Sequence, residues 1–208
     1  MRILNLYAGV GGNRRLWGDE HEVVAVEYDR HIATAYAGQH PNDELIVGDA
    51  HEYLLNHYSE FDYIWSSPPC QSHSRMRYHL GVGAKGFDFK YPDMSLYEEI
   101  LLLQNQLRKD QRFTVENVIP WYTPLIPAQK LHRHLYWADF NIPEQPHVHE
   151  SLRTIQIDDL QQMHGIRLER YYLPDRRQVL RNMVSPVAGL HIFNAMRASL
   201  PDAGAING

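Results

Sequence analysis

The sequence predicts one α/β domain with a mostly parallel sheet and helices on both of its faces. Short apolar runs alternate with longer stretches of helical periodicity, as in βαβ units. Glycines follow the first apolar run, and acidic residues follow the second and the third. A chain of 208 residues is also long enough to bury roughly 70% of its unfolded surface in a single core.

The first βα unit carries features of a nucleotide-binding site. Residues 3–7 form the first predicted strand, and the glycine-rich turn Ala8–Asn13 follows it. Residues 23–26 form the second strand, which ends on Glu27, at the distance expected for an acid that binds a ribose. Arg14 stands where the dinucleotide fingerprint needs its third glycine. The pattern therefore favours a ribose-bearing cofactor other than NAD.

The next unit places a second acid at the end of a strand. Asp29 is predicted to cap a helix that runs to about Ala37 and is closed by Gly38. Residues 45–47 form the third strand, and Asp49 follows it. Asp49 either caps the next helix, which runs to about His57, or binds the cofactor.

The fourth strand leads to the cysteine of the chain. Residues 61–65 form a buried strand, and Pro68 and Pro69 end it because proline has no N–H to donate. Cys70, the single cysteine, then lies at the strand edge where open α/β sheets bind ligands. A thiol there, with Arg75 close behind, is a candidate nucleophile. The alternative is a small buried hydrophobe.

The fifth strand brings a carboxylate to the same edge. Residues 74–92 form a long connection with glycines and basic residues, either a lid over the site or a solvated flexible segment. Residues 94–107 have apolar side chains at helical spacing. Residues 113–115 form the fifth strand, and Glu116 follows it on the edge that carries Cys70.

The remainder of the chain is less regular. Residues 135–137 are predicted to form a sixth strand, and a short helix is expected over residues 158–164. Ser185-Pro186 begins the final helix, which runs to about Ser199. His147 and His149 alternate without any further ligand pattern, so no metal site is expected.

Composition restricts the class of protein. The hydrophobic fraction of 44% and the charged fraction of 22% are ordinary for a globular protein. One cysteine excludes an internal disulfide and fits a reducing compartment, so a cytoplasmic location is expected. No apolar run reaches 18 residues, and the start becomes polar too soon for a signal peptide. No membrane association is therefore expected.

Charge is unevenly distributed along the chain. The net charge is −5, which at face value argues against a nucleic-acid partner. Residues 16–74, however, hold eleven acidic residues and one basic residue. Residues 75–181 hold fifteen basic residues and thirteen acidic ones. The second part of the chain can therefore face a polyanion.

The order of these motifs resembles that of the DNA (cytosine-5-)methyltransferases. The resemblance runs from Ile3 to about Ala198 and is closest to the short phage or prophage members, which include restriction-modification enzymes. The matching segments are Leu6–Gly12, Val26–Asp29, Gly48–Ala50, Pro69–Gln71, Glu116–Val118, Gln129–Arg133 and Asn182–Val184.

This resemblance implies a Rossmann-like S-adenosylmethionine-dependent methyltransferase fold and a set of site residues. The catalytic residues would be Cys70, Glu116 and Arg133. The cofactor contacts would be Tyr7, Ala8, Gly9, Val10, Gly11, Gly12, Glu27, Tyr28, Asp49, Ala50, Pro69, Asn182 and Val184. The DNA contacts would be Gln71, Ser74, Arg75, Arg77, Asn117 and Gln129.

The implied chemistry assigns a role to each of these groups. The Cys70 thiolate adds to carbon 6 of cytosine and makes carbon 5 nucleophilic toward the methyl donor. Glu116 stabilises the charge at ring nitrogen 3. Arg133 holds the carbonyl oxygen and helps to keep the thiol ionised. Glu27 binds the ribose hydroxyls and Asp49 the adenine amine, while Gly9, Gly11 and Gly12 leave space for the methionine part.

The implied partner is DNA with a flipped cytosine, in the cytoplasm of a bacterial host if the chain is phage-encoded. We expect a catalytic and cofactor-binding core over residues 1–140. A small, much reduced target-recognition insert is expected over residues 141–173, a segment returning to the core over 174–200, and a flexible tail over 201–208. A dimer or a partner protein could supply further recognition surface.

Departures from the family pattern leave alternatives open. Leu131 replaces the first arginine of its motif, His73 replaces an aromatic residue, and Met183 replaces a serine. A catalytically silent S-adenosylmethionine- and DNA-binding module remains an alternative. An RNA cytosine-5 methyltransferase is another. An enzyme that methylates an exocyclic amine fits Ser67-Pro68-Pro69, but Cys70 then occupies the position of its stacking aromatic residue.

Overall fold

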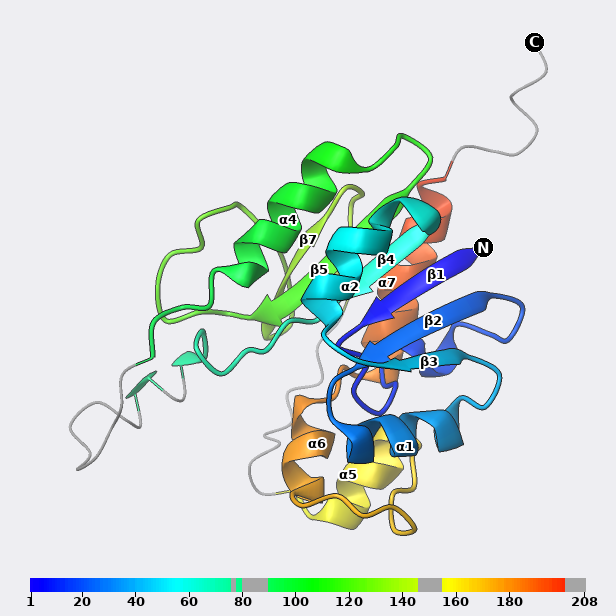
Figure 1. Ribbon diagram of the computed structural model, residues 1–208. Helices are drawn as coiled ribbons and strands as arrows, with labels where there is room; N and C mark the ends of the chain where they lie inside the picture. Colours follow the sequence, from blue (N-terminus) through cyan, green and yellow to red (C-terminus); the bar gives the residue numbers. More distant parts are fainter. Residues whose placement is uncertain (76–77, 80–89, 146–154, 201–208) are drawn as a thin grey trace.

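The computed structural model describes residues 1–75, 78–79, 90–145 and 155–200. Its centre is a seven-stranded sheet in the order β3-β2-β1-β4-β5-β7-β6 (Figure 1). Strands β1 to β5 are parallel, whereas β7 runs antiparallel to β5 and β6 antiparallel to β7. The strands are β1 (Arg2–Leu6), β2 (Glu22–Glu27), β3 (Glu44–Val47), β4 (Tyr63–Ser66), β5 (Arg112–Val118), β6 (Gln129–Leu131) and β7 (His134–Ala138).

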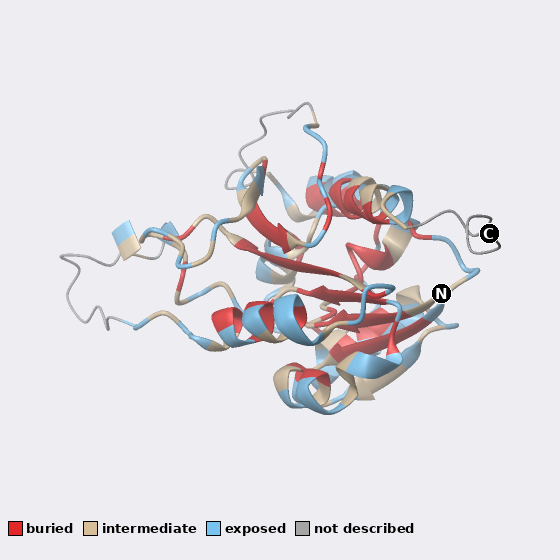
Figure 2. Ribbon diagram, turned by 90° about the horizontal axis from the view of Figure 1, so that it is seen from above, coloured by how far each residue is buried: buried red, intermediate tan, exposed pale blue. Residues whose placement is uncertain are grey.

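Helices cover both faces of the sheet, as the sequence predicts. They are α1 (Arg30–Gln39), α2 (Ala50–His57), α4 (Ser95–Gln106), α5 (Ile157–His164), α6 (Arg176–Asn182) and α7 (Pro186–Ala198), with 3-10 turns η1 (Arg14–Leu16) and η2 (Tyr58–Glu60). Leu4 and Leu6 of β1 pack with α2 and α4 on one face. Ile3 packs with Phe193 of α7 on the other face. The central strands β1, β2, β4 and β5 are therefore buried on both sides, which is why they read as continuous apolar runs (Figure 2).

Most predicted elements are confirmed, with shifts at their ends. Asp29 caps α1 as expected, with its Oδ1 accepting hydrogen bonds from the backbone N–H groups of His31 and Ile32. The expected closure of this helix by Gly38 is wrong, because α1 continues through Gln39. A Cβ at Gly38 would overlap the hydroxyl of Tyr171. Close packing, not a helix end, therefore explains the glycine.

The end of the sheet differs most from the prediction. The fifth strand continues to Val118, because it pairs along its length with β7. Glu116 therefore lies within β5 instead of following it. Strand β6 was not predicted, and it joins β7 through a tight turn in which His132 has a φ of 55°. The final helix begins at Pro186 as predicted.

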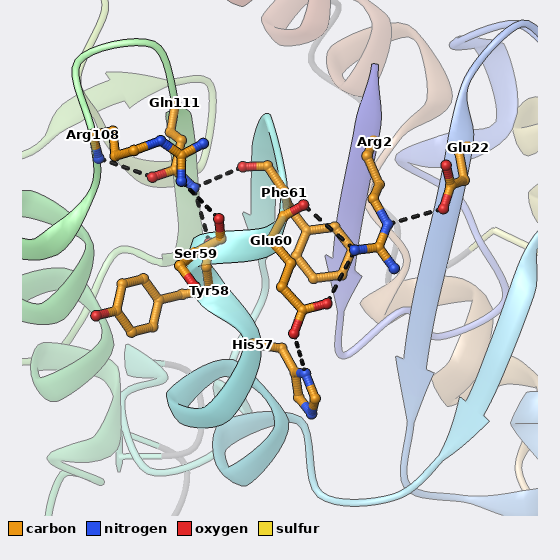
Figure 3. A network of polar contacts seen from close by, with 9 residues as sticks. All are labelled: Arg2, Glu22, His57, Tyr58, Ser59, Glu60, Phe61, Arg108 and Gln111. Carbon is orange, nitrogen blue, oxygen red and sulfur yellow. Dashed lines mark hydrogen bonds and ion pairs between the residues drawn. The ribbon is translucent and has the colours of Figure 1, made fainter.

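The amino ends of the strands are tied together by polar contacts (Figure 3). Arg2 of β1 pairs with Glu22 at 2.9 Å and with Glu60 at 3.0 Å, and its guanidinium lies 4.7 Å from the centre of the Phe61 ring. Gln111 donates to the Phe61 carbonyl at 2.7 Å. These contacts are at the sheet edge opposite Cys70, so they brace the fold without forming part of the site.

Helices α5 and α6 lie beyond the carboxyl ends of the strands, next to α1 (Figure 1). Leu160 and Leu180 pack with Val10 of the glycine-rich turn and with Ala35 of α1. The division into core, insert, returning segment and tail stays a prediction. Most of residues 74–92, His147, His149 and the tail lie outside the described residues. In the described ranges, none of the helices combines the length and hydropathy needed to cross a membrane.

Candidate active site

The loop that carries Cys70 is held on both sides by hydrogen bonds. Pro68 and Pro69 lead the chain out of β4, and the Asn117 side chain of β5 donates to the Pro68 carbonyl at 3.0 Å. On the far side, the Cys70 carbonyl accepts the N–H groups of His73 at 3.1 Å and Ser74 at 3.0 Å. The thiol is therefore fixed at the carboxyl end of β4, as the sequence predicts.

Burial determines the protonation of this thiol. Desolvation, with a further contribution from the nearby Glu116 carboxylate, raises the pKa of Cys70 to about 11. Cys70 is thus protonated at neutral pH. Among the described residues, Glu116 is the charged group that acts on the thiol, and Arg133 is not. The expectation that Arg133 keeps the thiol ionised is therefore not supported.

Glu116 lies within β5 opposite Tyr136 of β7 and is only 7% exposed. Its Oε1 is 3.6 Å from Nε2 of His134. Burial lowers the pKa of His134, although Glu116 opposes this shift, so the imidazole is neutral at pH 7. His134 is a site residue that the sequence analysis missed. Its spacing of two from Tyr136, on the same strand face, was the available signal.

Arg133 occupies the turn between β6 and β7, beside His134. Burial lowers the pKa of its guanidinium, and the charge of Arg181 in α6 acts in the same direction. The basic end of α6 therefore lies close to Arg133. The nearby Leu131 is 4% exposed and packs in the core beneath α7. An arginine at position 131 would have to be buried there, which explains the departure from the family pattern.

The Glu27 carboxylate lies at the end of β2 and holds the glycine-rich turn. Its Oε2 accepts the N–H of Gly9 at 2.9 Å, and its Oε1 accepts the N–H of Asp29 at 3.0 Å. Burial raises the pKa of Glu27 despite these two bonds. Each oxygen retains a second lone pair, so the carboxylate can also accept the two hydroxyls of a ribose.

The glycines of this turn do not all serve the same purpose. Gly9 has a φ of 57°, and a Cβ there would meet no described atom within 4 Å, which leaves open space for a ligand. At Gly11 a Cβ would overlap the imidazole of His40, and at Gly12 it would overlap Met183 and the Val184 carbonyl. The expectation of free space is therefore wrong for Gly11 and Gly12, where the protein packs against itself. The cradle at Gly9 and the Glu27 oxygens fit S-adenosylmethionine.

Other expected cofactor residues differ in how exposed they are and in what their side chains bind. Tyr28 is 79% exposed, so its ring is accessible for stacking on adenine. Asp49 caps α2, since its Oδ1 accepts the N–H groups of His51 at 2.9 Å and Glu52 at 3.1 Å. The capping alternative is thus confirmed, and an adenine contact by Asp49 stays a prediction that Oδ2 could fulfil. Pro69 and Asn182 are exposed, and Ala50 is buried beneath Asp49.

Several expected DNA contacts have their polar groups engaged within the protein. Asn117 is 2% exposed and donates a hydrogen bond to the loop that carries Cys70. Gln129 binds the backbone at both ends of its amide, to the Phe140 carbonyl and the Ile142 N–H, each at 2.7 Å. These placements favour positioning roles over DNA contacts. Arg75 donates to the Pro120 carbonyl at 2.6 Å, and Ser74 forms an isolated antiparallel β-bridge with Pro120. Gln71 is exposed, and Arg77 lies outside the described residues.

A second residue missed by the sequence analysis is Glu99 of α4, which is fully buried next to the site. It accepts hydrogen bonds from Tyr7 and from Ser66, each at 2.6 Å. Glu99 lies on the helix face that carries Leu96, Ile100 and Leu103. An acid within an apolar helical stripe was the signal that could have found it.

Comparisons with known proteins agree with this geometry. The family model for the C-5 cytosine-specific DNA methylase matches residues 1–118, more than half of the chain, including Cys70 and Glu116. A search of curated proteins finds no significant match.

Solved structures overlap with the chain only in part. They include TrmN from Thermus thermophilus (16% identity, 56% of this chain and 33% of that chain, TM-score 0.38). DNMT2 of Spodoptera frugiperda, solved as a mutant, has 24% identity over 56% of this chain and 35% of that chain, with a TM-score of 0.39. A SAM-dependent methyltransferase from Agrobacterium tumefaciens has 16% identity over 57% and 38%, with a TM-score of 0.39. The chain spans about a third of each of these proteins, so the fold is argued from its own sheet topology.

Proposed function

Because the chain belongs to the C-5 cytosine-specific DNA methylase family, we propose that it methylates carbon 5 of cytosine in DNA through a covalent bond to Cys70. The methyl donor of this family is S-adenosylmethionine. The observation that carries the proposal is the meeting of three groups at one sheet edge. These are the single thiol, the buried carboxylate of Glu116 beside it, and the Glu27 cradle.

The first step requires the thiolate of Cys70. The raised pKa of the thiol means that its proton must pass to a base when the substrate binds, and the nearby Glu116 carboxylate can take that proton and pass it to ring nitrogen 3. The sulfur lone pair then forms the bond to carbon 6, and the electrons of the 5,6 double bond move toward ring nitrogen 3. Glu116 is 7% exposed, and in so dry a site a hydrogen bond or proton from its carboxyl group to ring nitrogen 3 strongly stabilises the developing charge.

The second half of the reaction returns the cysteine. S-adenosylmethionine, when bound, supplies an electrophilic methyl group that carbon 5 attacks, with the donor sulfur leaving as a thioether. Water or another base then removes the proton at carbon 5, the 5,6 double bond re-forms, and the bond from carbon 6 to the Cys70 sulfur breaks while ring nitrogen 3 returns its proton to Glu116. Arg133 would hold the cytosine carbonyl oxygen throughout, and the neutral His134 would keep the far side of Glu116 in a polar environment.

Recognition of DNA would depend on the second part of the chain. A cytosine inside a duplex must be flipped out, which costs roughly a few kcal/mol of lost stacking. We assign contacts with the surrounding strand to the small insert 141–173, to Arg75 and to the basic end of α6 near Arg133. Such a small insert corresponds to a short recognition site.

The test is identification of the methylated product. Labelled S-adenosylmethionine is incubated with DNA or with RNA, the nucleic acid is digested, and the labelled nucleoside is identified. We expect 5-methylcytosine from DNA, and no label with Cys70→Ala. Label from RNA alone would assign the substrate to RNA, label on an exocyclic amine would refute the mechanism, and binding without transfer would indicate a silent module.

A further inference from the structure

Three site-bearing segments meet at one buried carboxylate. Glu99 is 0% exposed and lies in α4, which contributes no residue to the expected catalytic or cofactor set. Its Oε1 accepts the Tyr7 hydroxyl at 2.6 Å, and its Oε2 accepts the Ser66 hydroxyl at 2.6 Å. Nδ1 of His51 lies 3.1 Å from Oε1. A buried carboxylate is costly unless donors surround it, and here three do.

Each donor comes from a different functional segment. Tyr7 follows β1 and stands two residues before Gly9, where the cofactor cradle begins. Ser66 is the last residue of β4 and leads directly into the loop that carries Cys70. His51 is the second residue of α2, whose cap is Asp49. Glu99 therefore lies beneath the cofactor side and the catalytic side of the site at once.

The charges around Glu99 favour these bonds. Burial first, and then Glu99, raises the pKa of Tyr7, so its phenol remains a donor at any physiological pH. The hydrogen bond to Glu99 raises the pKa of His51, whose Nε2 also lies 3.5 Å from Glu98. The buried carboxylate of Glu99 therefore has three polar groups within hydrogen-bond distance.

Tyr7 also needs this anchor for its backbone. It has a φ of 54°, in the left-handed region that is strained for a residue with a side chain. The chain turns at this point so that Gly9 can donate to Glu27. A ring fixed by a 2.6 Å hydrogen bond keeps this turn in place.

We propose that Glu99 is a positioning residue that holds two separate parts of the site, the cofactor cradle through Tyr7 and the Cys70 loop through Ser66. The proposal rests on the proposed function of the site. It assigns Glu99 no contact with substrate or cofactor. Its consequence is that one carboxylate controls two properties that can be measured separately, cofactor affinity and thiol reactivity.

The two hydrogen bonds that Glu99 accepts, from Tyr7 and from Ser66, can be removed one at a time. Tyr7→Phe is expected to weaken S-adenosylmethionine binding about three- to tenfold, since a hydrogen bond to a charged group is lost. It should leave the alkylation rate of Cys70 by iodoacetamide unchanged in the absence of cofactor. Ser66→Ala is expected to do the reverse, changing the alkylation rate at least threefold with little effect on cofactor affinity. Glu99→Gln should change both.

Tyr63→Phe is the matched control, because it also removes a buried tyrosine hydroxyl, bonded to Thr114 at 2.8 Å on the opposite face of the sheet. It should move neither property. If all the variants lose thermal stability while affinity and alkylation stay as in the wild type, the role is structural and the proposal is overturned. The same holds if Tyr7→Phe and Ser66→Ala each change both properties equally.

If Glu99→Gln fails to fold, Tyr7→Phe and Ser66→Ala still decide the question. Neither calorimetric titration of the cofactor nor alkylation of the single cysteine requires methyl transfer. If the protein makes no 5-methylcytosine, but Tyr7→Phe changes only cofactor affinity and Ser66→Ala only the alkylation rate, the proposed function alone is refuted. A protein that methylates cytosine, but in which the two variants do not have separate effects, would refute the positioning role of Glu99 alone.

Discussion

The protonation of Cys70 can be tested directly, because it is the only cysteine in the chain. Its pKa is about 11, against an ordinary value of 9.0. At pH 7 the thiolate is therefore about one part in 10⁴ of the thiol, compared with about one in 10² for an ordinary cysteine. The alkylation rate of the free enzyme should rise about tenfold per pH unit and continue to rise well above pH 9.

Glu116→Gln separates the two effects of the carboxylate. Desolvation is the larger cause of the raised thiol pKa and the Glu116 charge the smaller, so removing that charge should lower the pKa toward its ordinary value. Alkylation of Cys70 at pH 7 should then rise, by less than the roughly 10²-fold that separates this thiol from an ordinary cysteine. Methylation should instead fall about 10²- to 10⁴-fold, because the charge at ring nitrogen 3 loses its stabilising acid.

The assay is the pseudo-first-order rate of iodoacetamide incorporation, read by mass spectrometry from pH 6 to pH 10.5. A wild-type rate that levels off near pH 8 would refute the account of a desolvated thiol. So would slower alkylation in Glu116→Gln, because it would mean that Glu116 promotes ionisation of the thiol instead of opposing it.

Three further predictions concern the cofactor and the scaffold. Glu27 must be ionised to accept ribose hydroxyls, and its pKa is raised. S-adenosylmethionine affinity should therefore decline as the pH falls, starting above the ordinary pKa of 4.5. A calorimetric affinity that stays constant down to pH 4.5 would contradict this. Arg14 and Asp43 form a buried ion pair with two 3.0 Å contacts. Arg14→Ala should therefore lower the free energy of unfolding, measured in urea, by about 3–5 kcal/mol. A loss under about 1 kcal/mol would show that this pair contributes little to stability. Gly38→Ala should destabilise by about 1–3 kcal/mol through overlap with Tyr171, despite the better helix propensity of alanine, and a higher melting temperature would show that the overlap is absent.

The parallel half of the fold follows from the sequence because strands buried on both faces appear as apolar runs. Strands β1, β2 and β4 lie within two residues of their predicted bounds for this reason. Strand β6 was missed because three edge residues, Gln-Lys-Leu, carry no such run. The length of β5 was underestimated because its last residues, Glu116 to Val118, are held in the strand by pairing with β7, a contact distant along the chain.

The candidate site was predictable where it depends on strand ends. Glu27 ends β2 and Cys70 follows β4 at the edge where these parallel strands finish, and Glu116 lies at the same level because Val115 pairs with Ser66, the last residue of β4. The space around Gly11 and Gly12 could not be predicted, since it is filled by His40 and Met183, which only the folded chain brings there. The two hydrogen bonds between the Gln129 amide and the backbone of Phe140 and Ile142 could not be predicted for the same reason, because only the folded chain brings these groups together.

The central claim is that Cys70 forms a bond with a pyrimidine ring beside Glu116. The most direct measurement is the mass of the protein after incubation with S-adenosylmethionine and a DNA duplex that carries 5-fluorocytosine, which blocks release of the cysteine. The account predicts a stable adduct of protein, oligonucleotide and methyl group that maps to Cys70 and is absent in Cys70→Ala. If the wild type methylates cytosine but never forms this adduct, the covalent mechanism is contradicted.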